Sequence, residues 1–131
     1  SSLCISYCKL LTQQKREPEA LSLIEKRLKR NWDPELIDCY GECASNNNID
    51  ALLYAESLLK KRNNDATLLR CLGRLAEKNN MIAKSEQYYK RSIEIEPSNT
   101  TLLLLAQQCE KQNKLFEANS YLKKIVTNQV T

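Results

Sequence analysis

The fold is decided by one stretch in the middle of the chain, which carries the pattern Leu69-x-x-Leu72-Gly73-x-x-Ala76, then Ser85-x-x-x-Tyr89, then Pro97. The small residue of this pattern, Gly73, recurs in weaker copies at Cys8, Gly41 and Ala106, with spacings of 33, 32 and 33 residues. A period of this length is typical of stacked structural repeats, in which each unit buries its apolar face against its neighbours. The chain is therefore expected to present an extended surface rather than a catalytic cleft.

Four helical hairpins follow from this period and from the apolar residues on one face of each segment. We expect first helices over 2–14, 34–45, 66–79 and 99–112, and second helices over 18–30, 50–62, 82–95 and 115–127. Asp33, Asp65 and Ser98 stand just before three first helices, where such side chains accept hydrogen bonds from free amides. The sequence thus predicts an all-α, right-handed α-solenoid in one domain, residues 1–131, with hairpins at about 1–31, 32–63, 64–97 and 98–131.

Three columns of repeat-equivalent residues are expected to fill the core. They are Cys4, Ile37, Leu69 and Leu102; Tyr7, Tyr40, Leu72 and Leu105; and Leu11, Ala44, Ala76 and Cys109. Mid-helix glycines cost about 1 kcal/mol against alanine, so we expect Gly41 and Gly73 to admit the paired helix of the hairpin. The second hairpin departs from the period by one residue, and its buried stripe is expected at Leu52, Ala55, Leu58 and Leu59 rather than at Leu53, Ser57 and Lys60.

Six cysteines occur without any histidine, which excludes His-based catalytic pairs and His metal ligands. Cys4 and Cys8 are four residues apart, as are Cys39 and Cys43. Disulfide scaffolds are usually shorter, and zinc ligands are usually joined across a turn. The favoured interpretation is that the cysteines are small buried apolar residues in a reducing compartment, and no metal or other cofactor is expected.

Composition and charge narrow the class of partner. The 20 basic and 16 acidic residues give a net charge of +4 and mostly interleave, whereas nucleic-acid binders concentrate basic residues on one face. The longest apolar run, residues 51–55, is far shorter than the roughly 20 residues that span a membrane. We expect neither nucleic-acid binding nor direct membrane insertion. Because the chain starts with Ser1 rather than Met, we expect it to be a fragment of a longer protein.

The pattern of residues 69–97 resembles the tetratricopeptide repeat, with Leu69 in the place of the preferred Trp and Tyr89 in that of Phe. Segments 28–33, 68–73 and 109–118 also resemble the C-terminal part of the HemY-type protohaem biogenesis proteins of proteobacteria. That resemblance implies an intact protein anchored by N-terminal helices at the cytoplasmic face of the bacterial inner membrane. It also implies a link to haem biosynthesis.

In tetratricopeptide stacks the first helices line a concave groove, and the resemblance implies the same arrangement here. The exposed positions of those helices would place in the groove Asp38, Glu42, Arg70, Arg74, Lys78 and Gln107. These side chains are either a docking site for a protein or peptide, or a solvated face whose charges pair with one another. The Lys and Asn pairs of chaperone-tail binders are missing.

The expected function is a non-catalytic protein–protein interaction scaffold. The alternative, suggested by the family resemblance, is tetrapyrrole binding through Cys or Tyr, with propionates on Arg70, Arg74 or Lys78. An enzyme is disfavoured, because Asp38 and Glu42 would lie on an open solenoid rather than in a pocket. Weak self-association is expected through the apolar residues of the last helix, Leu115, Phe116, Tyr121, Leu122, Ile125 and Val126.

Overall fold

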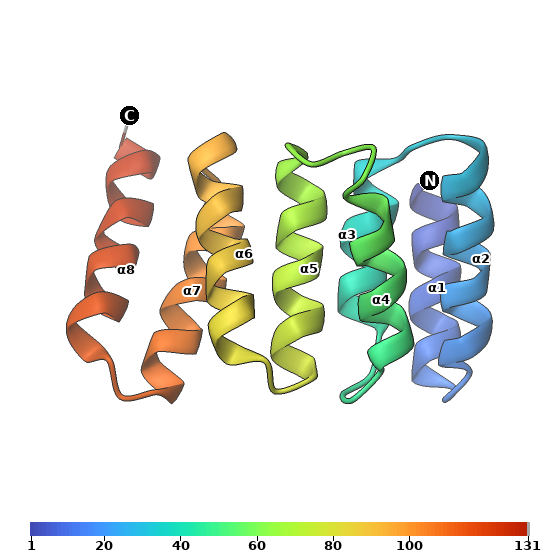
Figure 1. Ribbon diagram of the computed structural model, residues 1–131, viewed down its shortest axis with the longest axis horizontal. Helices are drawn as coiled ribbons and strands as arrows, with labels where there is room; N and C mark the ends of the chain where they lie inside the picture. The colour runs from blue at the N-terminus through green and yellow to red at the C-terminus, as the bar shows by residue number, and fades with distance from the viewer. Residues whose placement is uncertain (131) are drawn as a thin grey trace.

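The computed structural model describes residues 1–130, apart from the side chains at 126 and 128–130. The described chain forms eight α-helices, joined by short turns: α1 (Ser2–Gln13), α2 (Glu17–Arg30), α3 (Pro34–Cys43), α4 (Ile49–Leu58), α5 (Ala66–Lys78), α6 (Ile82–Ile95), α7 (Asn99–Lys111) and α8 (Leu115–Val130). Figure 1 shows them as four antiparallel hairpins in a row, with the two termini at opposite ends. The prediction of an all-α solenoid is confirmed.

The helix starts follow from local chemistry. Asp33 Oδ1 accepts from the Glu35 amide at 3.0 Å, and Asp65 Oδ1 accepts from the Leu68 amide at 3.0 Å. Asn48 caps α4 in the same way, with 3.1 Å from its Oδ1 to the Ala51 amide. Ser98 was expected to cap α7 but makes no such bond. Its hydroxyl instead accepts from the Arg70 guanidinium at 3.2 Å, because α5 brings that donor close to the start of α7.

The turns inside the hairpins share one backbone device. Each contains a residue with φ between 60° and 66°, namely Lys15, Asn47, Asn80 and Asn113. Asparagine tolerates this left-handed region better than most residues. Three of the four turns therefore use a residue type that suits this backbone conformation.

Burial of the core columns matches the sequence, with one exception. All members of the three columns are buried except Tyr7, which is 49% exposed. The prediction for Tyr7 was wrong because its equivalents are covered by the preceding hairpin, and no described helix precedes α1. In the second hairpin, Leu52 and Ala55 are buried and Leu58 and Leu59 are half-buried, while Leu53, Ser57 and Lys60 are exposed. This burial pattern agrees with the one-residue shift. That helix ends at Leu58 rather than near residue 62.

The two glycines admit different neighbours. A Cβ at Gly73 would lie 2.3 Å from the ring of Tyr89, in the second helix of the same hairpin. A Cβ at Gly41 would instead lie 3.3 Å from the Cα of Cys71, in the first helix of the next hairpin. The expectation that Gly41 admits its paired helix was therefore wrong: α3 packs closely on α5 and makes little contact with α4.

The most exposed apolar side chains lie on the first and the last helix, at Leu3 and Phe116. On α8, Leu115 and Phe116 are exposed, while Tyr121, Leu122 and Ile125 are half-buried. Val126, expected on the same face, lies outside the described side chains. None of the described helices is long and apolar enough to cross a membrane.

Candidate functional site

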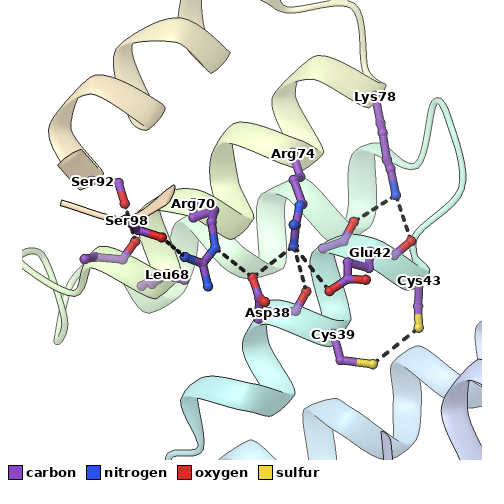
Figure 2. A network of polar contacts seen from close by, with 12 residues as sticks. Asp38, Cys39, Glu42, Cys43, Leu68, Arg70, Arg74, Lys78, Ser92 and Ser98 are labelled. Atoms are coloured by element: carbon purple, nitrogen blue, oxygen red, sulfur yellow. Dashed lines mark hydrogen bonds and ion pairs between the residues drawn. The ribbon is translucent and has the colours of Figure 1, made fainter. Parts of the chain in front are cut away.

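A carboxylate shared by two arginines lies at the seam between α3 and α5. Asp38 Oδ1 is 3.0 Å from Arg70 Nε and 2.9 Å from Arg74 Nη1. The Arg74 Nη1 is also 3.5 Å from Glu42 Oε1. Figure 2 shows the two guanidinium groups converging on Asp38 from successive turns of α5. The like charges at Arg70 and Arg74, unfavourable on an isolated helix, are compensated across the seam.

These ion pairs are largely shielded from water. The exposed fractions of the side chains are 15% for Arg70, 14% for Arg74 and 24% for Asp38. A hydrogen bond to a charged group contributes about 1.5–3 kcal/mol, and removing one partner of a shielded pair leaves an uncompensated charge. The network therefore braces the seam between α3 and α5.

Lys78 closes the C-terminal end of α3. Its Nζ donates to the backbone carbonyls of Gly41 at 2.8 Å, Glu42 at 2.9 Å and Ala44 at 2.7 Å. These carbonyls belong to the end of a helix, where backbone acceptors lack partners and a cation is favourable. Burial lowers the pKa of Lys78 from its usual 10.5, and nearby Arg74 lowers it further. Figure 2 shows this side chain reaching over the end of α3.

A hollow of about 490 Å³ opens beside this network. It crosses the ends of α3, α5 and α7 and is lined by Glu42, Asn46, Arg74, Glu77, Lys78, Tyr89, Leu104 and Lys111. Successive first helices meet at three seams, and α5 and α7 make less contact than α1 with α3 or α3 with α5. The hollow therefore lies at the most open of these seams. It is an open surface depression rather than an enclosed pocket.

The structure divides the predicted groove residues into three groups. Glu42, Arg74 and Lys78 line the hollow, whereas Asp38 and Arg70 belong to the ion-pair network beside it. Gln107 is exposed on α7 but is not part of the lining. Of the two interpretations of these charges, mutual pairing describes Asp38, Arg70 and Arg74.

The lining also contains residues that the first-helix columns did not single out. Glu77 and Leu104 stand one position away from predicted core residues, and Tyr89 comes from the second helix of the third hairpin. Tyr89 donates to Glu77 Oε1 at 3.4 Å, and Lys111 Nζ is 3.8 Å from Glu77 Oε2. Burial raises the pKa of Tyr89, with the Glu77 charge adding to the effect. No repeat column predicts these contacts: the first joins α6 to α5 within one hairpin, and the second depends on how far α7 stands from α5.

The cysteines do not form a site at this surface. All six are free and buried, as expected of small apolar residues. The Sγ atoms of Cys39 and Cys43 are 3.5 Å apart, and burial raises the pKa of Cys8 to about 12. Among residues 1–130, no group of three or more His, Cys, Asp or Glu side chains could hold a metal ion.

Comparisons with known proteins identify the fold. No protein-family model matches the chain, and no curated protein matches it. A solved structure that does match is MamA (41-end) from Desulfovibrio magneticus RS-1, with a TM-score of 0.64 and 14% sequence identity. The match covers 95% of this chain and 72% of that one. The chain has a tetratricopeptide-like helical-repeat fold. The narrower resemblance to HemY-type proteins is not confirmed by these comparisons.

Proposed function

We propose that the chain is a non-catalytic scaffold that binds a protein or peptide segment across α3, α5 and α7. The observation that carries this proposal is the hollow of about 490 Å³, which crosses three of the four first helices beside the ion-pair network. Tetratricopeptide-like stacks offer extended surfaces of this kind for recognition. Fold alone does not fix function, so the argument depends on the side chains that remain available in the hollow.

The available side chains are those not already held by the chain itself. Lys111 is 75% exposed and only loosely paired with Glu77, while Asn46 is exposed at the opposite rim. Leu104 is half-buried in the lining, and the neighbouring Leu103 is exposed. A segment with an apolar side chain over the leucines and an acidic group near Lys111 fits this arrangement. Binding should weaken with salt, because the charged contact is solvent-exposed.

The experiment compares two charge reversals of equal size. Lys111→Glu alters the hollow, whereas Lys61→Glu alters an exposed residue in the turn between α4 and α5, outside the lining of the hollow. Wild type and both variants are immobilised, and proteins captured from bacterial extract are quantified by mass spectrometry. Proteins captured by the wild type and by Lys61→Glu but lost with Lys111→Glu would support the proposal. Equal capture by all three would contradict it.

The cellular setting rests on the sequence resemblance alone. We propose that the intact protein is anchored by N-terminal helices at the cytoplasmic face of the bacterial inner membrane and serves haem biosynthesis. Fractionation of cells that express the intact protein tests the location, and recovery in the cytosol would contradict it. Direct tetrapyrrole binding has less support, because the thiols are buried and Arg70 and Arg74 are held by Asp38. A hemin titration without a saturable Soret shift would remove that alternative.

A further inference from the structure

The first helix carries an apolar stripe that nothing in the described chain covers. Leu3, Tyr7 and Leu10 are 83%, 49% and 48% exposed, and their spacing places them on one face of α1. The charged residue of this helix is Lys9. A contiguous exposed apolar face of this kind marks an interaction surface rather than a solvated one.

The repeat identifies what kind of surface this is. The equivalents of the three residues in α3, α5 and α7 are all buried, although they vary in chemistry. For Leu3 they are Leu36, Leu68 and Thr101; for Tyr7 they are Tyr40, Leu72 and Leu105; for Leu10 they are Cys43, Leu75 and Gln108. The exposed face of α1 is therefore the face with which every other first helix packs into the stack.

The partner of that face inside the chain is the second helix of the preceding hairpin. Tyr40 donates to Glu25 Oε2 of α2 at 2.8 Å, and Gln108 Nε2 donates to Ser85 Oγ of α6 at 2.9 Å. Both contacts join a first helix to the second helix before it. The face of α1 is thus shaped for a second helix of this same repeat type.

One second helix is left without a following first helix in the described chain. It is α8, at the opposite end of the row from α1 in Figure 1. Its Leu115 and Phe116 are 62% and 87% exposed. The outer face of α8 also bears a hollow of about 750 Å³, lined by Phe116, Asn119, Ser120, Leu122, Lys123, Lys124 and Thr127. Leu115 and Lys123 of α8 stand at the repeat positions of Glu17 and Glu25 of α2, which bond to Ser45 and Tyr40 of the next hairpin. The two ends of the row therefore correspond to the two sides of an internal seam.

We propose that the α8 face of one copy docks on the α1 face of a second copy, so that the solenoid continues from molecule to molecule. The contact would repeat the seams between α2 and α3 and between α6 and α7, which the chain already forms within itself. Such a head-to-tail contact joins two different surfaces, so it can be repeated along a row of copies. Because α1 lacks acidic side chains to pair with Lys123 and Lys124, the association is mainly apolar and should depend little on salt.

The test uses three matched pairs of substitutions in the full 131-residue chain. Leu3→Gln/Tyr7→Gln removes the apolar face of α1, and Leu115→Gln/Phe116→Gln removes that of α8. Ile49→Gln/Leu53→Gln changes two exposed apolar residues with the same four-residue spacing as Leu3 and Tyr7, but on α4, away from both ends. All substituted residues are exposed, so circular dichroism should show unchanged helicity.

Sedimentation velocity over rising concentration gives the readout. Wild type and the α4 control should form dimers and longer species, and the α1 and α8 variants should each associate at least tenfold more weakly. An equimolar mixture of the α1 and α8 variants should form a dimer and nothing longer, because one intact pair of faces remains. A monomeric wild type would overturn the proposal and leave the α1 face to another segment or partner. Self-association of either end variant at wild-type strength would overturn it by indicating contact between identical faces.

Discussion

Two contacts between successive first helices, α3 with α5 and α5 with α7, differ in how closely the helices pack. Between α3 and α5 the helices pack closely, Gly41 lies against Cys71, and Asp38 holds both arginines of α5. Between α5 and α7 the contact is slight, and the hollow occupies the space. The residues of α7 in the columns of Asp38 and Glu42 are Leu103 and Gln107, which offer no carboxylate.

The same repeat position therefore serves two purposes. At Gly41 the missing side chain lets the next first helix approach, whereas at Gly73 the space is filled by the ring of Tyr89 from the paired helix. Two first helices pack closely where a glycine leaves room for the backbone of the next helix and where opposite charges pair between the two helices. Where these conditions are not met, the stack keeps an opening, which is the proposed binding surface. Four measurements would break or sharpen this comparison.

Raising the pH should have the largest effect on stability, because the buried tyrosines lie both on α3, beside the closed seam, and on α6, beside the open one. Burial raises the pKa of Tyr40 on α3, and of Tyr88 and Tyr89 on α6, above the usual value of 10. Above pH 10 the unfolded chain loses these phenol protons while the folded chain keeps them, so the free energy of unfolding falls. The loss is about 1.4 kcal/mol per pH unit for each tyrosine.

Urea unfolding between pH 8 and about pH 11 measures this loss. Tyr40→Phe and Tyr89→Phe should each remove a similar share of the slope, since both phenols are buried. A slope unchanged by either substitution would show that other groups are responsible.

Replacing each glycine with alanine should show how the stability effect depends on the neighbour, which is the Tyr89 ring at Gly73 and the Cys71 backbone at Gly41. In Gly73→Ala the new methyl group would overlap the buried ring of Tyr89, so we expect a loss of about 2–3 kcal/mol in the free energy of unfolding. In Gly41→Ala the new group meets Cys71 at 3.2–3.4 Å, and a helix-propensity gain of about 1 kcal/mol offsets most of the strain. Urea unfolding midpoints compare the two. Equal losses would mean that the neighbours of the two glycines do not matter.

Removing the shared carboxylate should loosen the closed seam. Asp38→Asn leaves Arg70 and Arg74 shielded from water without their main acceptor, and we expect a loss of about 2 kcal/mol. The matched control is Glu19→Gln, which breaks the exposed pair with Arg16 and should leave the unfolding midpoint unchanged. The loss for Asp38→Asn should shrink in Arg70→Met/Arg74→Met, where no charge is left unpaired. A loss that stays the same in that background would refute the network.

The smallest effect is expected at the end of α3. Lys78→Met keeps the apolar stem but leaves three carbonyls without their donor, at a cost of about 1 kcal/mol. Lys111, in the same column of α7, makes only the loose contact with Glu77, so Lys111→Met should change stability little. Thermal unfolding of both variants checks the contrast. A larger loss of stability in Lys111→Met than in Lys78→Met would contradict the view that Lys78 is held by the fold while Lys111 is free to contact a partner.

Much of the fold was predictable because its determinants are local. Helix limits follow from caps such as Asp33 and Asp65 and from turn residues such as Asn80, and the period of the small residues places the hairpins. The candidate site was predictable in part. The columns pointed to Glu42, Arg74 and Lys78, but Tyr89 and Leu104 enter the hollow through the spacing of whole helices.

The sequence by itself determined a row of four hairpins and the face that each first helix buries, because helical periodicity and capping act over a few residues. The tertiary structure decided which first helices pack closely, which charged side chains form ion pairs, and which helix faces at the ends of the row stay exposed. Those outcomes depend on contacts such as Gly41 with Cys71 and Asp38 with Arg74. Residues 30 or more positions apart meet there at distances that no local pattern fixes.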